Sequence, residues 1–473
     1  MTVIETAERL LPLGLKNRLT PLLRRLEPIL RDDSETARAQ RMALIAFAIR
    51  IISAAIAFLS QIILARLMGE FEYGIFAFVW VLVVVFGNLS CLGFHTAVIR
   101  FLPQHQNRGE SELVRGLNWT ARIVAMLSAT TLAVSGLVFM TVFDSFVPDY
   151  WLIPVFLGLF TLPMIALGDV LDGTARANGW AVTALSPTYI IRPLLILFLM
   201  LVAVWSGQPQ SARTAMEAAL AATYITTLFQ FIRMTYRLRR QLGRGALSFA
   251  LMPWFRFSLP LFLVDGIGFL LTNADVVVVG FFLPPDQVAV YYAAAKTIAL
   301  VQFVYFSVKA AAAPRFAGIL AEHDQSSLAQ FSAQAARWSF WPALLVGLSV
   351  LAMGEILLGL FGPAFTSGYP LMAILFAGIL AKALVGPGEV LLNMAGRQSL
   401  CVAIYAVVLA YAVTVNIVIV PRFGLYGAAS ATASAMMLEA VLLHIAVRKK
   451  LGIILFAFAR AVKNPNTEGA SNG

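Results

Sequence analysis

Long apolar runs, each long enough to cross a bilayer, follow one another along almost the whole chain. A helix that spans the hydrocarbon core takes about 20 apolar residues. On that measure the pattern predicts about twelve spanning helices, at residues 41–66, 72–99, 117–143, 150–171, 184–205, 213–236, 255–281, 288–312, 336–361, 367–392, 398–420 and 424–447. We therefore expect an all-α polytopic membrane protein.

Basic residues lie on alternate connections between these runs. Of the 35 Lys and Arg residues, 27 lie on one set of connections or in the two tails, whereas Arg66, Arg213 and Arg422 lie on the other set. Short basic loops stay on the cytoplasmic side during membrane insertion, so the alternation predicts that both termini are cytoplasmic. The remaining five lie inside predicted spans and are Arg50, Arg122, Arg192, Lys296 and Lys382.

The composition supports the same class of protein. Hydrophobic residues make up 60% of the chain and charged residues 12%, whereas charged residues are about 25% of an average soluble domain. The net charge of +11 is spread along the predicted cytoplasmic rim, which favours attraction to anionic membrane lipids and argues against nucleic-acid binding. Cys91 and Cys401 both lie in apolar runs and indicate no disulfide framework.

The pattern divides the chain into five segments. Residues 41–236 and 255–447 each hold six predicted spans, and residues 237–254 join them as a basic cytoplasmic linker. Residues 1–40 thread leucines between charged side chains, so we expect an interfacial amphipathic segment on the cytoplasmic leaflet, with a disordered tail as the alternative. Residues 448–473 form a predicted cytoplasmic tail.

Short similarities relate the two six-span halves. The matching segments are Leu67–Gly69 and Tyr73–Phe76 with Phe282–Pro284 and Val288–Tyr291 at an offset of 215, and Asp169–Leu171 and Ala175 with Glu389–Leu391 and Ala395 at an offset of 220. Both halves have an even number of spans and therefore enter the membrane in the same direction. We expect two lobes related by a pseudo-twofold axis along the membrane normal, with a substrate site between them.

This layout resembles the polysaccharide-transporter branch of the multidrug/oligosaccharidyl-lipid/polysaccharide exporter superfamily. The resemblance covers about residues 41–447 and includes the junction Leu67–Phe76 and the junction from Leu391 to Ala395-Gly396-Arg397. Several relatives have two further C-terminal spans, of which Leu451–Ala461 is at most a remnant.

The resemblance implies a flippase that moves undecaprenyl-diphosphate-linked oligosaccharide across the bacterial inner membrane. Its product would serve the synthesis of a surface polysaccharide, namely exopolysaccharide, capsule or O-antigen. The partners that it implies, besides membrane lipids, are a polysaccharide polymerase and chain-length proteins.

Two charges deep in repeat-related spans form the first candidate site. A charge in hydrocarbon costs about 2.5–3.5 kcal/mol on insertion scales, so each needs a partner or an aqueous cavity. The offset of 215 places Arg50 on Asp265, and helical periodicity puts Ser53 and Ser60 beside the first and Thr272 beside the second. We expect these polar residues to line an inter-lobe cavity in which an Arg50–Asp265 pair opens when substrate or ion binds. A permanent ion pair within one bundle is the alternative.

The other intramembrane basic residues predict a cationic cavity. Together with Arg50, the side chains of Arg192, Lys296 and Lys382 are suited to bind a diphosphate by charge-assisted hydrogen bonds. Two simpler explanations stay open: carbonyl groups freed at a proline kink for Arg192, and ion pairs with Glu355 or Glu389 for the two lysines.

Asp275, in the outer third of its predicted span, is the candidate for a coupling ion, either H⁺ or Na⁺. No other cofactor and no metal is expected. Several tryptophans, Trp80 among them, lie near span ends, where interface anchoring is the default role, with sugar stacking left open for one or two.

The sequence shows no enzyme constellation. The four histidines lack metal-ligand spacing, and no phosphate-binding loop is present. Two other functions remain as alternatives. An ion-coupled small-molecule or drug exporter of the same superfamily shares the layout, and a membrane-embedded polysaccharide polymerase or ligase would need longer outer loops.

Overall fold

The computed structural model describes residues 35–459, except 144, 146, 244 and 323, and of the residues from 35 to 51 it describes the side chain of Ile49 alone. The predicted segment 1–40 thus lies almost wholly outside the described residues, as does the tail from residue 460. The described residues form helices and no strand. The helices are α3 (Glu35–Ser90), α4 (Phe94–Asn107), α5 (Ser111–Val142), α6 (Asp149–Ala177), α7 (Ala181–Ser186), η2 (Pro187–Ile191), α8 (Arg192–Trp205), α9 (Ala212–Leu242), α10 (Leu251–Phe282), α11 (Pro285–Ile298), η3 (Ala299–Val301), α12 (Gln302–Ala321), α13 (Gln325–Ala352), α14 (Gly354–Phe361), η4 (Pro363–Gly368), α15 (Tyr369–Val385), α16 (Gly388–Met394) and α17 (Gln398–Leu451).

Ten helical stretches among the described residues are long and apolar enough to cross a membrane. The predicted fold class, an all-α polytopic membrane protein, is therefore confirmed. Two of the ten, within α3 and α17, contain a glycine whose backbone is not helical and at which the chain reverses. The exact count of twelve spans and the twofold axis between the halves stay predictions.

Helix α3 is a hairpin that turns at Gly69, where φ is 76° and ψ is 173°. The hydroxyl of Tyr73 donates a hydrogen bond to Oε1 of Gln61 at 2.8 Å. On a straight helix these residues would lie about 18 Å apart along the axis. The side chains meet because the second arm of α3 runs back along the first.

Helix α17 reverses in the same way at Gly424, where φ is 56° and ψ is −136°. A Cβ placed on Gly427 would lie 2.9 Å from the carbonyl oxygen of Ile419. Eight residues of straight helix would separate those positions by about 12 Å. The reversal at Gly69 falls in a predicted connection, and the reversal at Gly424 falls on the first residue of the predicted span 424–447.

One predicted span, residues 72–99, is interrupted in the structure. Helix α3 ends at Ser90, Leu92 and Gly93 have positive φ, and α4 leaves in a new direction. A Cβ on Gly93 would overlap the carbonyl oxygen of Ser258 in α10, so the interruption allows two backbones to meet closely. Hydropathy alone carries no signal for such a break because both sides of it are apolar.

The chain after α17 folds back as a strap, residues 452–459. The amide of Ala457 donates to the carbonyl oxygen of Leu384 at 3.0 Å, and Arg337 donates to the carbonyl oxygens of Ala457 and Ala459 at 3.0 and 2.8 Å. Leu455 is fully buried. Residues 452–459, the described part of Leu451–Ala461 beyond α17, are therefore a packed, non-helical segment.

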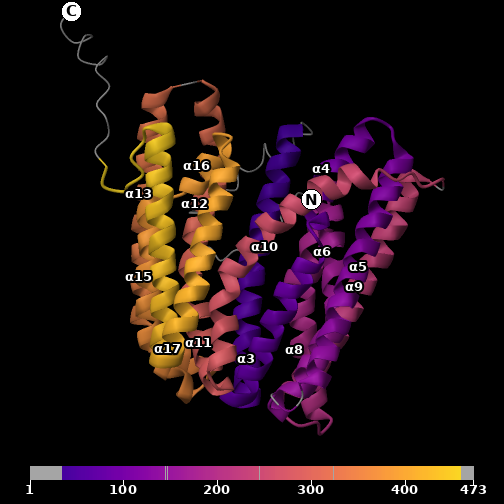
Figure 1. Ribbon diagram of the computed structural model, residues 1–473, viewed down its shortest axis with the longest axis vertical. Coiled ribbons are helices and arrows are strands. Elements are labelled where there is room, and N and C mark those ends of the chain that lie inside the picture. The colour runs from indigo at the N-terminus through magenta and orange to yellow at the C-terminus, as the bar shows by residue number, and fades with distance from the viewer. Residues whose placement is uncertain (1–34, 144, 146, 244, 323, 460–473) are drawn as a thin grey trace, which may run out of the picture.

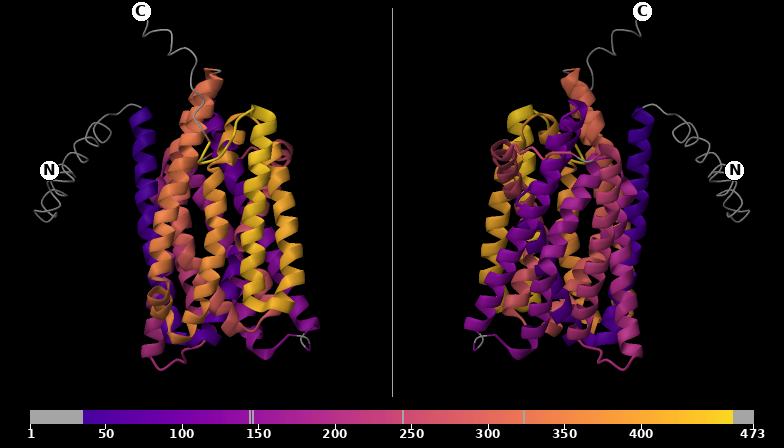
Figure 2. Two further views of the ribbon diagram at one scale, coloured as in Figure 1. Left: turned by 90° about the vertical axis from the view of Figure 1, so that its left-hand side faces the viewer. Right: turned by 90° about the vertical axis from the view of Figure 1, so that its right-hand side faces the viewer.

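The helices form two bundles (Figure 1). The N bundle comprises α3–α9 and the C bundle α10–α17, with α3, α10 and α11 lying between the outer helices of the two. The first described turns of α3 and the last turns of α17 lie at the same end of the molecule (Figure 2). We call this end the basic end, since the predicted basic connections lie there, and the end at which α3 reverses the hairpin end.

The bundles meet at the hairpin end along a tight seam between α3 and α11. Gly74 packs so closely that a Cβ there would overlap the carbonyl oxygen of Pro285. The ring of Tyr73 lies 6.2 Å from that of Tyr292. Arg66 donates from Nε and Nη2 to the carbonyl oxygens of Leu360 and Gly359, both at 2.6 Å. A cation at the carboxyl end of α14 is favoured by the helix dipole, so Arg66 helps to close the seam.

We predict that Gly74→Ala opens the seam, because the added methyl group has no room and overpacking of this kind costs about 1–3 kcal/mol. A single cysteine introduced by Gln61→Cys, in a chain with Cys91 and Cys401 replaced by Ala, should then react faster with an impermeant maleimide added at the hairpin end.

Gly318→Ala is the matched control, because a Cβ on Gly318 meets no atom within 4 Å. Equal labelling of Gly74→Ala and Gly318→Ala in folded protein would contradict the seam as the closure of this end.

Candidate functional site

A central cavity of about 740 Å³ lies between the two bundles. Residues from α3, α4, α6, η2 and α8 line it on the N-bundle side, and residues from α10, α11, η3 and α12 line it on the C-bundle side. The charged side chains among its described lining residues are Asp169, Asp172, Arg176, Arg192, Asp265 and Lys296. The described part of the wall is thus of mixed charge, and Asp169 and Asp172 add acidic groups that the predicted set of cavity residues did not include.

Arg192 lines this cavity, as predicted, and is only 5% exposed. It begins α8 directly after the π-helical turn η2, and such turns re-aim the side chains that follow them. Asp169 and Asp172 lie close enough to interact with its charge. Its buried Nε has no hydrogen-bond partner among the described residues, so the guanidinium retains a donor.

The two aspartates are themselves held by amides of the N bundle. Asn88 donates to Asp169 at 3.2 Å, and Gln230 donates to Asp172 at 2.9 Å. Both carboxylates therefore lie in the cavity wall where they interact with the charge of Arg192.

Asp265 also lines the central cavity, and it connects the two bundles. The hydroxyl of Thr96 donates to its carboxylate at 2.8 Å, and Nε2 of His95 lies 3.3 Å from the same oxygen. Both partners belong to α4 and therefore to the N bundle. The predicted partner, Arg50, has its side chain outside the described residues, so the predicted pair stays a prediction.

Lys296 borders the central cavity and a second cavity at once. Its Nζ lies 5.1 Å from the centre of the Tyr292 ring. Among the described residues no carboxylate lies within ion-pair distance of it, so the predicted pairing with Glu355 or Glu389 is absent there. Lys296 is therefore a cation that is available to a ligand.

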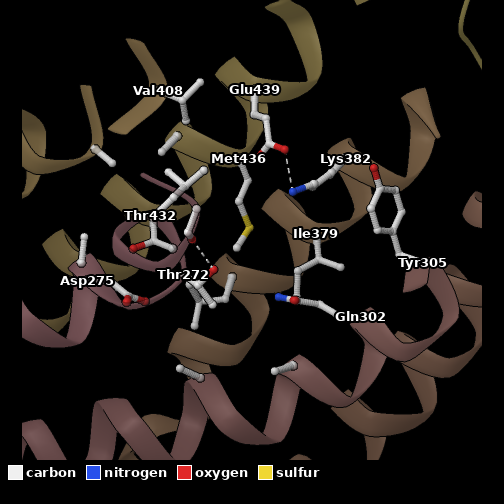
Figure 3. A pocket seen from close by; sticks show the side chains of 18 of the residues that line it. Thr272, Asp275, Gln302, Tyr305, Ile379, Lys382, Val408, Thr432, Met436 and Glu439 are labelled. Carbon is white, nitrogen blue, oxygen red and sulfur yellow. Dashed lines mark hydrogen bonds and ion pairs between the residues drawn. The ribbon is translucent and has the colours of Figure 1, made fainter. Parts of the chain in front are cut away.

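The second cavity, of about 380 Å³, lies within the C bundle, and we call it the C-bundle cavity. Lys382 lines this cavity and not the central one, which corrects the prediction that it joins Arg192 and Lys296. Its Nζ forms an ion pair with Glu439 at 2.6 Å (Figure 3). Because the pair is internally neutral, Lys382 contributes little net positive charge.

A second ion pair lies in the same cavity. Nζ of Lys309 lies 2.6 Å from Glu389, and the hydroxyl of Tyr305 donates to the other carboxylate oxygen at 2.7 Å. The Tyr305 ring lies 5.7 Å from Nζ of Lys309 and 5.6 Å from Nζ of Lys382. The aromatic ring thus stands between the two pairs.

Asp275 lines the C-bundle cavity within an oxygen-rich group (Figure 3). The hydroxyl of Tyr291 donates to its carboxylate at 2.8 Å and lies 3.2 Å from the hydroxyl of Thr432. Asn416, which is 1% exposed, lines the same cavity, and its Oδ1 has no hydrogen-bond partner among the described residues. Carboxylate, hydroxyl and amide oxygens suit a hard cation.

The three polar residues that were predicted to line one cavity lie in different places. Ser60 lines the central cavity and Thr272 lines the C-bundle cavity. Ser53 is buried and is not among the lining residues of either cavity. It lies two helical turns before Ser60, so the same helix face leaves the cavity wall within that distance.

Sequence reasoning missed several residues of these cavities. His95 and Thr96 lie just after the break at Gly93, and Glu439 lies inside a predicted span. None of the three was among the predicted site residues. Glu439 had a usable signal, since an acidic residue in an apolar span demands a partner. Which span supplies that partner is not encoded in the periodicity of either helix.

Residues 41–320, more than half of the chain, match a family model described as polysaccharide biosynthesis protein. The chain belongs to this family. No curated protein matches the sequence significantly. The family assignment and the apolar helices together indicate a multi-pass membrane protein of a polysaccharide biosynthesis family.

Solved structures share the fold of this family member. An inward-facing multidrug resistance MATE family transporter of the MOP superfamily aligns with a TM-score of 0.69 at 16% identity, over 85% of this chain and 94% of that chain. The lipid II flippase MurJ, in an inward closed conformation, aligns with a TM-score of 0.67 at 11% identity, over 86% of this chain and 87% of that chain.

A further match is a MOP superfamily transporter from Pyrococcus furiosus whose binding pocket is described as having reverse polarity. Its TM-score is 0.62 at 16% identity, over 90% of this chain and 97% of that chain. At these identities the likeness concerns the fold. It confirms the predicted superfamily resemblance together with the family match.

We predict that Lys382→Met lowers the stability of the protein by about 3–5 kcal/mol, because it leaves the buried Glu439 carboxylate without its partner. The double variant Lys382→Met/Glu439→Gln should recover most of that loss. Thermal unfolding in detergent measures both. Equal stability of the single and double variants would contradict the pairing.

Proposed function

We propose that this protein is a flippase that moves a polyprenyl-diphosphate-linked oligosaccharide, of the undecaprenyl type, across the bacterial inner membrane for surface polysaccharide synthesis. The observation that carries the proposal is the central cavity between two bundles of a polysaccharide biosynthesis family member, in which Arg192 and Lys296 face the same space. A diphosphate carries about two negative charges and many acceptor oxygens, which guanidinium and ammonium groups bind by charge-assisted hydrogen bonds.

The mechanism that we propose is alternating access. The glycan and diphosphate occupy the central cavity, and the polyprenyl tail stays in the lipid through a gap between the bundles. The seam at Gly74 and Pro285 closes the hairpin end. Rocking of the bundles would open this seam and narrow the central cavity at the basic end. In this arrangement the basic end and both termini are cytoplasmic, as the distribution of basic residues predicts.

Asp265 is a suitable gating group in this mechanism. It lines the central cavity and bonds to Thr96 and His95 across the boundary between the bundles. A motion that separates α4 from α10 must break both contacts. The gating role that the sequence suggested for Asp265 is therefore retained, with α4 supplying its described partners.

Asp275 is the group that we propose for ion coupling. Its carboxylate, the Thr432 hydroxyl and the Asn416 amide lie around the C-bundle cavity, which shares Lys296 with the central cavity. A cation, H⁺ or Na⁺, bound at Asp275 would change the field at Lys296, with which Asp275 interacts. Substrate and ion sites are thus connected through one side chain.

We expect Arg192→Ala to slow flipping about tenfold or more, because a hydrogen bond to a charged group contributes about 1.5–3 kcal/mol. The measurement uses purified protein in vesicles with a fluorescent undecaprenyl-diphosphate oligosaccharide and an impermeant quencher. Arg192→Lys should give an intermediate rate, since it keeps the charge and loses the planar fork.

Arg422→Ala, which removes an exposed arginine outside both cavities, is the control and should match the unchanged protein. If the unchanged protein flips no lipid-linked oligosaccharide but exports cationic drugs, the superfamily's exporter function replaces the one proposed.

In the same vesicles, substitutions of Asp275 and Asp265 are expected to have different effects on flipping. Asp275→Asn should make flipping insensitive to imposed H⁺ and Na⁺ gradients, because the neutral amide cannot change its charge with the ion. Asp265→Asn should alter the rate while the response to the gradient remains. Full gradient response in Asp275→Asn would remove this residue from coupling.

A further inference from the structure

Trp80 lies in the wall of the central cavity, although its place near a span end favoured a role at the membrane interface. It lies near the middle of the second arm of α3, eleven residues after the reversal at Gly69. Its ring is only partly buried and is stacked with Phe76, with ring centres 6.3 Å apart and an angle of 11° between the planes. An aromatic surface therefore faces the space between the bundles.

Two polar donors accompany this surface. The indole N–H of Trp80 makes no hydrogen bond within the described part of the chain, and neither does Nε2 of Gln61, whose Oε1 accepts the hydrogen bond from Tyr73. Both residues line the cavity from opposite arms of the α3 hairpin. Indole and amide N–H groups in membrane proteins normally find a partner, so these two donors are suited to a polar ligand.

A chain of contacts connects Gln61 to the cation of the cavity. Gln61 bonds to Tyr73, the Tyr73 ring lies 6.2 Å from that of Tyr292, and Nζ of Lys296 lies 5.1 Å from the Tyr292 ring. The Gln61 amide and the ammonium group are therefore connected through Tyr73 and Tyr292, in the same cavity that Trp80 lines. A ligand with a phosphate at Lys296 would place its adjoining group near this aromatic wall.

We propose that Trp80, Gln61 and Tyr292 form a carbohydrate subsite for the sugar that is bonded to the diphosphate; this inference rests on the proposed flippase function. A pyranose ring presents a face of C–H groups, which packs on an aromatic ring, and a rim of hydroxyl groups, which accept hydrogen bonds. The wall supplies both kinds of partner. The subsite gives the cavity a means to distinguish a glycosylated carrier lipid from the bare diphosphate.

The polyprenyl tail is the other occupant that an aromatic wall suggests. The unpaired N–H groups of Trp80 and Gln61 argue against it, because a hydrocarbon chain that covers them offers no hydrogen-bond acceptor and burial of an unpaired N–H is unfavourable. A sugar satisfies those donors. The two occupants therefore predict opposite results in a binding experiment that compares lipids with and without a sugar.

The test compares the affinities of the purified protein in nanodiscs for undecaprenyl diphosphate and for undecaprenyl diphosphate glucose. We expect the unchanged protein to bind the glucosylated lipid about tenfold more tightly, the order of one ring-stacking contact. Trp80→Leu should abolish this preference and leave the affinity for the bare lipid unchanged. Trp205→Leu, which alters a tryptophan that is 90% exposed, is the matched control and should keep the preference.

Trp80→Phe keeps a ring but loses the indole N–H and part of the stacking area, so it should retain part of the preference. Trp80→Phe replaces Trp80→Leu in this comparison if the leucine variant does not fold. An unchanged preference in the folded Trp80 variant, or an equal loss for both lipids, would overturn the subsite and leave the flippase function standing. Failure of the unchanged protein to bind either lipid would overturn the function, and the subsite with it.

Discussion

The cost of a charge in hydrocarbon determines where the polar groups of this protein lie. A lone charge at the bilayer centre is disfavoured by about 2.5–3.5 kcal/mol on insertion scales. The described structure meets this constraint in two ways. Lys382 and Lys309 are paired with carboxylates inside the C bundle, whereas Arg192 and Lys296 face the central cavity. Those two side chains make the central cavity the site at which the proposed charged substrate would bind.

The seam at the hairpin end gives this polar interior a closed side. Glycine at position 74 allows α3 and α11 to touch backbone to backbone, and the ring of Phe78 in α3 packs against Gly280 of α10. Arg66 ties the N bundle to the end of α14. Closely packed contacts are favourable only when the two surfaces fit, and a small displacement loses them. They therefore suit a junction that is either fully closed or open. Two rigid bundles with a switchable seam are what alternating access requires.

Much of this fold could be predicted from the sequence because hydropathy reports directly on contact with lipid. The approximate positions of the spans followed from the apolar runs. Arg192, Lys296, Asp265 and Asp275 could be selected as candidate cavity residues because each is a charge inside such a run. Two breaks did not follow: the one at Gly93, and the one at Gly386, which separates α15 from α16 within the predicted span 367–392. Both depend on backbones that approach from other helices. The pairing of Lys382 with Glu439 did not follow either. Periodicity shows which face of a helix is polar but not which helix that face meets.

The central claim is that the cavity carries a lipid-linked glycan from one leaflet to the other. Its most direct test is the leaflet distribution of undecaprenyl-diphosphate-linked oligosaccharide in inner membranes of cells that lack this protein and cells that contain it. The account predicts that the lipid accumulates on the cytoplasmic leaflet when the protein is absent and returns to the outer leaflet when it is restored. An identical distribution in both kinds of cell would contradict the account.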